Sequence, residues 1–222
     1  MSRDLGAVRR PSKTAAFDAA RTWDAASLRG YLASAPGLVG AVDAKGRSLL
    51  HRACSVRPGV PGLNESDGTE TVATLLKAGA DLEQVAPMDK DEGDFRATPL
   101  WYALARGENP PLARFLLAQG ADASTSLWAV VWRDDDAMCR ELLKQKPKLN
   151  LRAHGETPIL YAARLQRLKT LDVLIEAGAD PTIADYRGRD AVDIARARRL
   201  PWSVIERLDA LGRRTTFDRQ SR

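Results

Sequence analysis

The 222-residue sequence is poor in the side chains that build disulfide frameworks, metal centres and nucleophilic active sites, since it has only two cysteines and two histidines. Cys54 and Cys139 have no close partner along the chain, which argues against a disulfide framework and is typical of a reducing compartment. We expect both to be small residues of a buried core.

Phosphate-binding and calcium-binding loops are missing as well. Gly59, Gly62 and Gly68 lack the Lys-Ser/Thr pair that a nucleotide site requires. The acidic stretch 89–94 has glycine at its fifth position and leucine at the twelfth, whereas an EF-hand loop needs glycine at the sixth and glutamate at the twelfth. The sequence therefore predicts no cofactor, no metal and no enzymatic activity.

Long apolar runs are also absent. No run of seven apolar residues precedes the first expected helix, so neither a secretory signal nor a membrane span is predicted. We expect a cytoplasmic protein with no membrane contact, while export by a specialised secretion machine stays open. Arginine outnumbers lysine 26 to 8, which hints at a GC-rich coding sequence and a bacterial source.

The net charge of +5 comes from the two ends of the chain. The stretches 1–22 and 184–222 have an excess of basic residues, and the middle is nearly neutral. Basic ends without interleaved aromatic platforms resemble solvated tails more than a nucleic-acid groove. No specific nucleic-acid partner is expected, and weak nonspecific attraction through Arg213 and Arg214 is the most that the tail suggests.

What the sequence does contain is internal repetition. The segment Leu174-Ile175-Glu176-Ala177-Gly178-Ala179-Asp180 recurs, almost letter for letter, at 75–81 and at 116–122. Repeated units that cannot bury their own apolar faces stack on their neighbours into a solenoid, so one domain is expected.

A second motif lies in fixed register with the first. It reads Thr98-Pro99-Leu100-Trp101-Tyr102-Ala103 in one unit, with variants beginning at Ser48 and Thr157. Thr or Ser caps a helix, Pro fits its first turn, and the Gly after the second helix ends it in the left-handed conformation. From Thr157 to the equivalent Asp190 is 33 residues (190 − 157). Through these motifs the chain resembles the ankyrin repeat family.

The resemblance implies a mostly helical fold: an all-α, ankyrin-type solenoid of about six helix-turn-helix repeats joined by hairpin-like fingers. The repeats, numbered here as units one to six, are expected at 14–43, 44–93, 94–123, 124–150, 151–183 and 184–212. The whole array would span 14–212, between a flexible basic segment at 1–13 and a flexible basic tail at 213–222. Insertions are predicted near 56–68 and 85–93. Unit four departs most, because the stretch 122–128 leaves too few residues for a full finger.

Some aromatic and polar residues have competing interpretations. His51 stands at the histidine position of the family motif and is expected to hydrogen-bond the finger, while His154 is expected to be exposed on its finger. Trp101, Trp128 and Trp132 are expected to form an aromatic seam packed between units, with Trp132 as the exception, because the resemblance implies that residues near the end of a first helix face the groove. The acidic run 134–136 is either a solvated turn or a docking site for a basic partner.

The resemblance also implies a concave groove lined by fingers and first helices. Phe95 and Tyr186 are the sharpest candidates for partner contact if their rings are exposed; packing against an adjacent finger is the alternative. The full set of predicted partner-binding residues is Lys45, Arg47, Phe95, Trp132, His154, Glu156, Tyr186, Arg187 and Arg189.

The function implied by the resemblance is a noncatalytic protein-protein interaction module that is a monomer when free. Two other roles remain open. The protein could be an inhibitor or immunity-type partner that occludes a toxin or enzyme, or a secreted bacterial effector that binds host proteins. The sequence does not choose between them.

Overall fold

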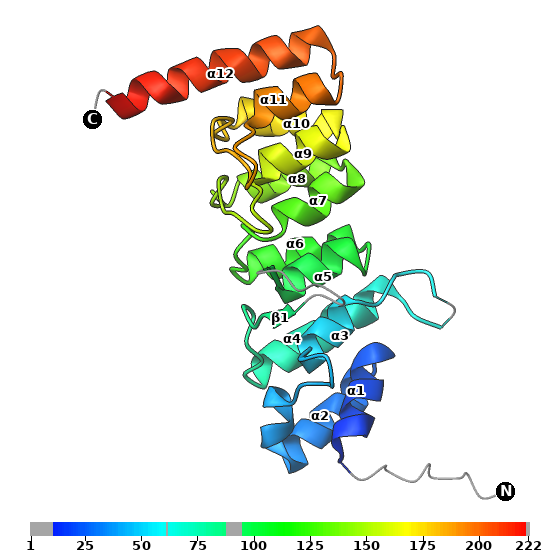
Figure 1. Ribbon diagram of the computed structural model, residues 1–222. Helices are drawn as coiled ribbons and strands as arrows, with labels where there is room; N and C mark the ends of the chain where they lie inside the picture. Colours follow the sequence, from blue (N-terminus) through cyan, green and yellow to red (C-terminus); the bar gives the residue numbers. More distant parts are fainter. Residues whose placement is uncertain (1–10, 61, 88–94, 221–222) are drawn as a thin grey trace, which may run out of the picture.

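Pairs of short antiparallel helices follow one another along the chain and stack into an elongated array (Figure 1). The fold comes from a computed structural model that describes residues 11–60, 62–87 and 95–220. The helices and strands are α1 (Lys13–Arg21), α2 (Ala25–Ser34), the 3-10 helix η1 (Pro36–Gly40), α3 (Leu49–Cys54), α4 (Glu65–Lys77), β1 (Ala86–Pro87), β2 (Arg96–Ala97), α5 (Pro99–Ala105), α6 (Pro110–Ala118), α7 (Leu127–Arg133), α8 (Asp136–Leu143), α9 (Pro158–Leu165), α10 (Leu168–Glu176), α11 (Ala191–Ala197) and α12 (Trp202–Gln220).

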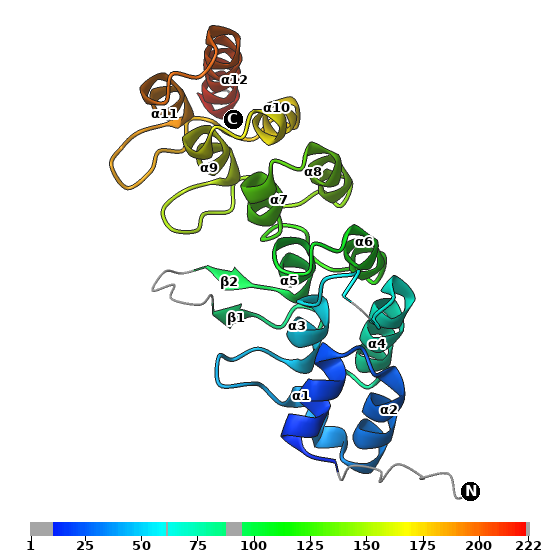
Figure 2. The same cartoon turned by 90° about the vertical axis from the view of Figure 1, so that its right-hand side faces the viewer.

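The helices form two layers. The first helices of the units, α1, α3, α5, α7, α9 and α11, pack on one another in chain order, and the second helices form a parallel layer behind them (Figure 2). Within the second layer, α6 and α8 pack more loosely than α8 and α10 do. This stack of helix pairs in two layers confirms the predicted ankyrin-type solenoid.

Helix boundaries follow the motif chemistry. The side chains of Ser48 and Thr98 accept hydrogen bonds from backbone N–H groups in the first turns of α3 and α5, and Pro158 occupies the first position of α9. Gly79 and Gly178 follow second helices with φ of 92° and 78°, a conformation that costs glycine little.

His51 has the structural role predicted for it. The backbone N–H of Ser48 donates to Nδ1 of His51 at 3.2 Å, so Nε2 bears the proton and donates to the carbonyl of Ala97 at 3.1 Å. The side chain is fully buried, and burial lowers the pKa of His51. A neutral histidine thus ties unit two to the finger of unit three.

The regular fingers are held by a carboxylate at the turn. Asp43 accepts hydrogen bonds from the backbone N–H groups of Lys45 and Arg47, and its other oxygen accepts from the Arg47 guanidinium at 2.9 Å. Asp185 repeats this pattern with Arg187 and Arg189. Burial opposes ionisation of Asp43, but these hydrogen bonds outweigh it and hold the pKa of the carboxyl below its usual value.

One continuous core runs between the two helix layers. Most of its largest fully buried side chains are leucines, and both cysteines belong to it. Burial raises the pKa of Cys54 and raises that of Cys139 to about 12, so both thiols are inert at neutral pH. The expectation that the cysteines are unpaired core residues is confirmed.

Two boundaries differ from the sequence expectation. The loop predicted at 56–68 ends earlier, because Asn64 and Asp67 form a capping box that starts α4 at Glu65. Gly68 then packs in that helix against Trp23, where a Cβ atom would lie 2.9 Å from the ring.

The C-terminal tail also differs. The residues from 213 to Gln220, predicted to be flexible, belong to α12, which projects beyond the rest of the stack (Figure 1). No helix breaker follows Gly212, and Arg213 pairs with Asp209 one turn earlier. Residues 1–10 of the predicted N-terminal segment and residues 88–94, at the second predicted insertion, lie outside the described residues. The strands β1 and β2, on either side of 88–94, pair antiparallel.

Candidate partner-binding site

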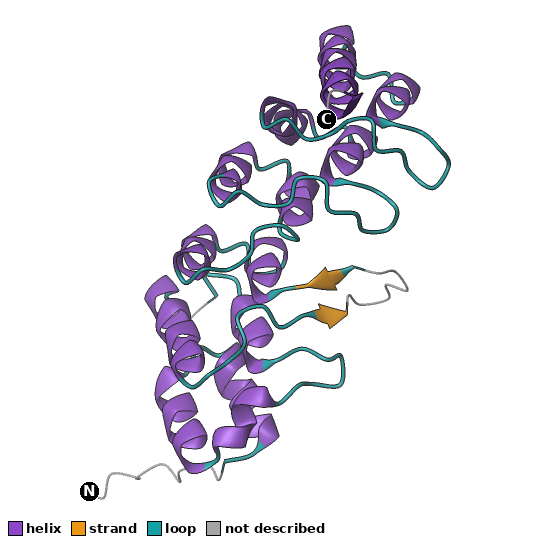
Figure 3. Ribbon diagram, turned by 90° about the vertical axis from the view of Figure 1, so that its left-hand side faces the viewer, coloured by secondary structure: helices purple, strands orange, loops and turns teal. Residues whose placement is uncertain are grey.

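Unit four has no finger. Loops project from one side of the stack before α3, α5, α9 and α11, whereas the chain enters α7 directly (Figures 2 and 3). Asp122 accepts hydrogen bonds from the backbone N–H and the hydroxyl of Ser124, and Ser124 Oγ accepts from the backbone N–H of Lys148. This short polar turn replaces the finger and leaves a gap in the row, as the residue count in the sequence predicted.

The fingers of units three and five meet across the gap. The rings of Phe95 and His154 are stacked with their centroids 6.0 Å apart. Phe95 also packs edge-to-face on Trp101 and Trp128, at centroid distances of 5.7 and 5.6 Å. The missing finger therefore allows rings from three units to form one cluster.

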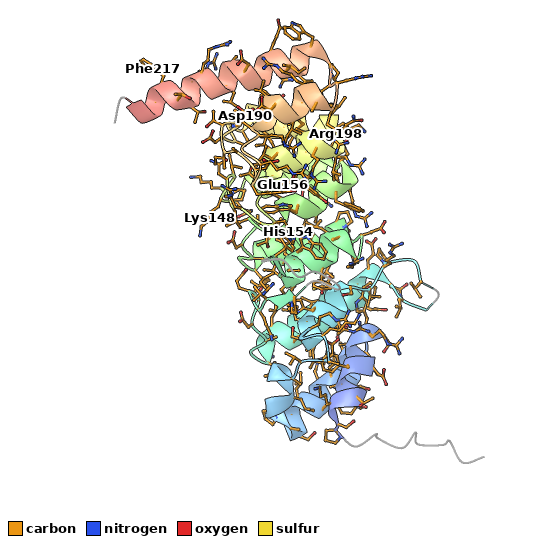
Figure 4. All side chains as sticks on the ribbon, in the orientation of Figure 1. Lys148, His154, Glu156, Asp190, Arg198 and Phe217 are labelled. Carbon is orange, nitrogen blue, oxygen red and sulfur yellow. The ribbon has the colours of Figure 1, made fainter. Side chains whose placement is uncertain are left out.

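A cavity of about 420 Å³ lies against this cluster. We call it the aromatic cavity. Its ring-bearing residues are Phe95, Trp101, Trp128, Trp132, His154 and Tyr161, and its charged residues are Arg106, Glu156 and Arg164. They come from the fingers of units three and five and from the first helices α5, α7 and α9. Figure 4 shows His154 and Glu156 midway along the array.

Two arginines in the cavity lie over aromatic rings. The Arg164 guanidinium donates to both carboxylate oxygens of Glu156, at 2.6 and 2.8 Å, and lies 5.2 Å from the centroid of Tyr161. The hydrogen bond with Glu156 raises the pKa of Arg164, and burial raises that of Tyr161. The Arg106 guanidinium lies 5.9 Å from the Trp101 centroid, and no described carboxylate pairs with it.

The structure places the predicted site residues in three groups. Trp132, with 56% of its surface exposed, and His154 lie at the cavity as exposed residues. Phe95 is only 5% exposed, so its predicted exposure is wrong and the packing alternative holds; the gap lets the ring turn inward onto the tryptophans. Glu156 is 8% exposed because it is paired with Arg164.

The other predicted residues lie on separate fingers and do not converge on the cavity. Tyr186 is 73% exposed, with the Arg187 guanidinium 5.2 Å from its centroid. Arg47 and Arg189 are held by the turn carboxylates of their fingers, and Lys45 is exposed beside Arg47.

Sequence reasoning missed Arg106, Tyr161 and Arg164 as cavity residues. A signal for Arg164 was available, because it occupies the same position in α9 as Trp132 does in α7, counted from the Pro158 and Ser126 positions of the motif. Neither interpretation of the acidic run 134–136, a solvated turn or a docking site, anticipated the structural role of Asp134. It ends α7 with φ of 54°, and its carboxylate accepts hydrogen bonds from the backbone N–H and the hydroxyl of Thr170.

Within 11–60, 62–87 and 95–220, no group of three or more histidine, cysteine or acidic side chains is arranged to hold a metal ion. None of the helices in those ranges is both long enough and apolar enough to cross a membrane.

Comparisons with known proteins agree with the architecture. A family model described as ankyrin repeats, three copies, matches residues 100–185. The ankyrin repeat domain-containing protein M-T5 of Myxoma virus (strain Lausanne) is 27% identical over 137 residues, which cover 57% of this chain but only 28% of that protein.

Solved structures cover more of the chain. An ankyrin repeat domain from Acinetobacter baumannii AYE superposes with a TM-score of 0.66 at 23% identity, covering 90% of this chain and 99% of the other. The ankyrin repeat protein EF0377 gives a TM-score of 0.65 at 20% identity, covering 90% and 98%. At these identities the likeness concerns the fold.

Proposed function

Because this chain is an ankyrin repeat protein, we propose that it is a noncatalytic interaction module that binds a protein partner through the groove of its fingers and first helices. The observation that supports this most is the aromatic cavity, which opens in the groove where unit four lacks a finger. Exposed aromatic residues beside a concave, largely apolar surface are typical of binding hot spots.

Trp132 is the residue on which the proposal depends most. More than half of its surface is exposed, and a tryptophan so exposed contributes little to the fold. It lines the aromatic cavity together with Arg106, which directly follows α5, and Tyr161 of α9. Tyr186, Arg187 and Lys45 would extend the contact along neighbouring fingers. We also propose that the protein is a monomer when free and that it is located in the cytoplasm. The two unpaired cysteines support the cytoplasmic location.

The test is capture of a native partner with the full chain and two matched variants. Trp132→Ala should lower the partner's affinity by about tenfold or more, because truncating a central aromatic costs about 2 kcal/mol. Trp202→Ala removes an equally exposed tryptophan, 66% exposed on α12, and should leave binding unchanged. Circular dichroism checks that both variants fold. A partner that binds the two variants equally well would place the interface outside the groove.

A further inference from the structure

Three carboxylates of the fingers at Asp43, Glu156 and Asp185 expose little uncompensated negative charge. Three described finger carboxylates are paired with arginines, and the pairs are Asp43 with Arg47, Glu156 with Arg164, and Asp185 with Arg189. The side chains of these three acids are 20%, 10% and 1% exposed. They therefore have little capacity to attract a basic partner.

Basic groups on the same face keep their charge. Arg106 lies over Trp101, Arg187 lies over Tyr186, and Arg152 donates to the backbone carbonyls of Gly155 and Ala184. None of these three guanidinium groups has a carboxylate partner in the described part of the chain. Among the described residues, the contacts of these guanidinium groups are with aromatic rings and backbone carbonyls, so a partner carboxylate would gain from each of them.

The aromatic cavity favours an apolar occupant over a cationic one. Its volume of about 420 Å³ falls within the range of ligand sites, about 300–1,000 Å³, and rings form most of its wall. The Trp101 and Tyr161 rings already have arginines over them. With two arginines against one glutamate, the cavity has a positive balance that opposes entry of a lysine or arginine side chain.

We propose that the groove binds an extended acidic segment of the partner protein, with one bulky apolar side chain in the aromatic cavity and a neighbouring carboxylate bound by Arg106. Arg152 and Arg187, on the next two fingers, would contact further acidic residues of the same segment. This inference rests on the proposed function, because it specifies the chemistry of the partner that the groove accepts.

Selection from a random peptide library displayed on phage tests the inference with the full chain. Peptides retained by the wild-type protein and not by Trp132→Ala should be enriched in a Phe, Trp, Leu or Ile residue with Asp or Glu within a few positions. Enrichment of lysine or arginine beside the apolar residue would overturn the inference. So would the absence of any peptide whose binding depends on Trp132.

The contribution of charge is then measured on one selected peptide by fluorescence anisotropy. Arg106→Gln should weaken binding severalfold and reduce its dependence on salt, because a carboxylate-guanidinium contact is lost. Arg214→Gln makes the same charge change on exposed α12 and should alter neither quantity. Replacing the peptide's apolar residue with alanine should cost about tenfold. Equal effects of the two arginine variants would show that Arg106 makes no specific contact.

The proposed binding groove and the inference that it binds an acidic segment can fail separately. If selected peptides are basic but still require Trp132, the groove is the binding site and the acidic-segment inference is wrong. If selected peptides and captured partner bind Trp132→Ala as well as the wild type, both the inference and the proposed groove are wrong.

Discussion

The finger at Asp185 and the fingerless entry to α7 show two outcomes of the same local chemistry. Both use an aspartate that accepts the backbone N–H of the residue two positions later, Arg187 in the finger and Ser124 in the short turn. In the finger, Arg189 completes the turn and leaves Tyr186 outside. At the short turn no hairpin covers the first helices, so rings from the flanking fingers pack into the gap and leave a cavity beside them.

The comparison teaches that a deletion within a repeat array can create a site. The turns of the regular fingers are held by their own carboxylates, while the gap brings side chains from units three and five into contact. At the same place α6 packs loosely on α8, and Arg114 and Glu141 join the two helices by a bidentate ion pair.

The largest expected effect on stability comes from Trp128, the buried tryptophan beside the gap. Trp128→Ala removes a ring that is 6% exposed and packs on Phe95, so it should lower the free energy of unfolding by about 3–5 kcal/mol. Trp132→Ala, on the same helix, should cost less than about 1 kcal/mol because its ring is already in water. Urea denaturation followed by far-UV circular dichroism measures both. Equal losses of unfolding free energy in the two variants would mean that the buried Trp128 and the exposed Trp132 contribute alike to stability.

A smaller effect is expected at the joint between units four and five. Asp134→Ala removes the side-chain acceptor of the buried Thr170 N–H, leaves the Thr170 hydroxyl only its longer hydrogen bond to the Arg167 carbonyl, and places alanine at a left-handed position. About 1–3 kcal/mol should therefore be lost. Asp134→Asn keeps an acceptor oxygen and tolerates positive φ, and should retain most of the stability in the same denaturation experiment. If the asparagine variant is as unstable as the alanine variant, the negative charge matters more than the geometry.

The smallest effect concerns pH and the regular fingers. The pKa of Asp43 is lower in the folded protein than in the unfolded chain, so the ionised carboxylate adds stability that is present above the unfolded pKa, about 4. That contribution is lost as the pH falls through the lower, folded pKa. Between about pH 6 and pH 3, the melting temperature of the wild type should therefore fall more steeply than that of Asp43→Asn. If the melting temperatures of the two proteins fall in parallel, the turn carboxylate does not contribute to stability.

Much of this fold could be predicted because it depends on local chemistry. The capping by Ser48 and Thr98, the left-handed glycines after second helices and the buried neutral His51 all follow from residues within one repeat or from its neighbour. The start of α4 at Glu65 was missed because the surrounding Pro and Gly residues obscured the capping box of Asn64 and Asp67.

The repeat register, the stacking order and the absence of a finger in unit four follow from the sequence alone, because each depends on motif spacing along the chain. Only the tertiary structure decided what fills the gap. The burial of Phe95, the pairing of Glu156 with Arg164 and the convergence of α5, α7 and α9 on one cavity join side chains that are distant in sequence. Their contacts depend on how three units are positioned by packing, and a one-dimensional pattern does not specify those distances.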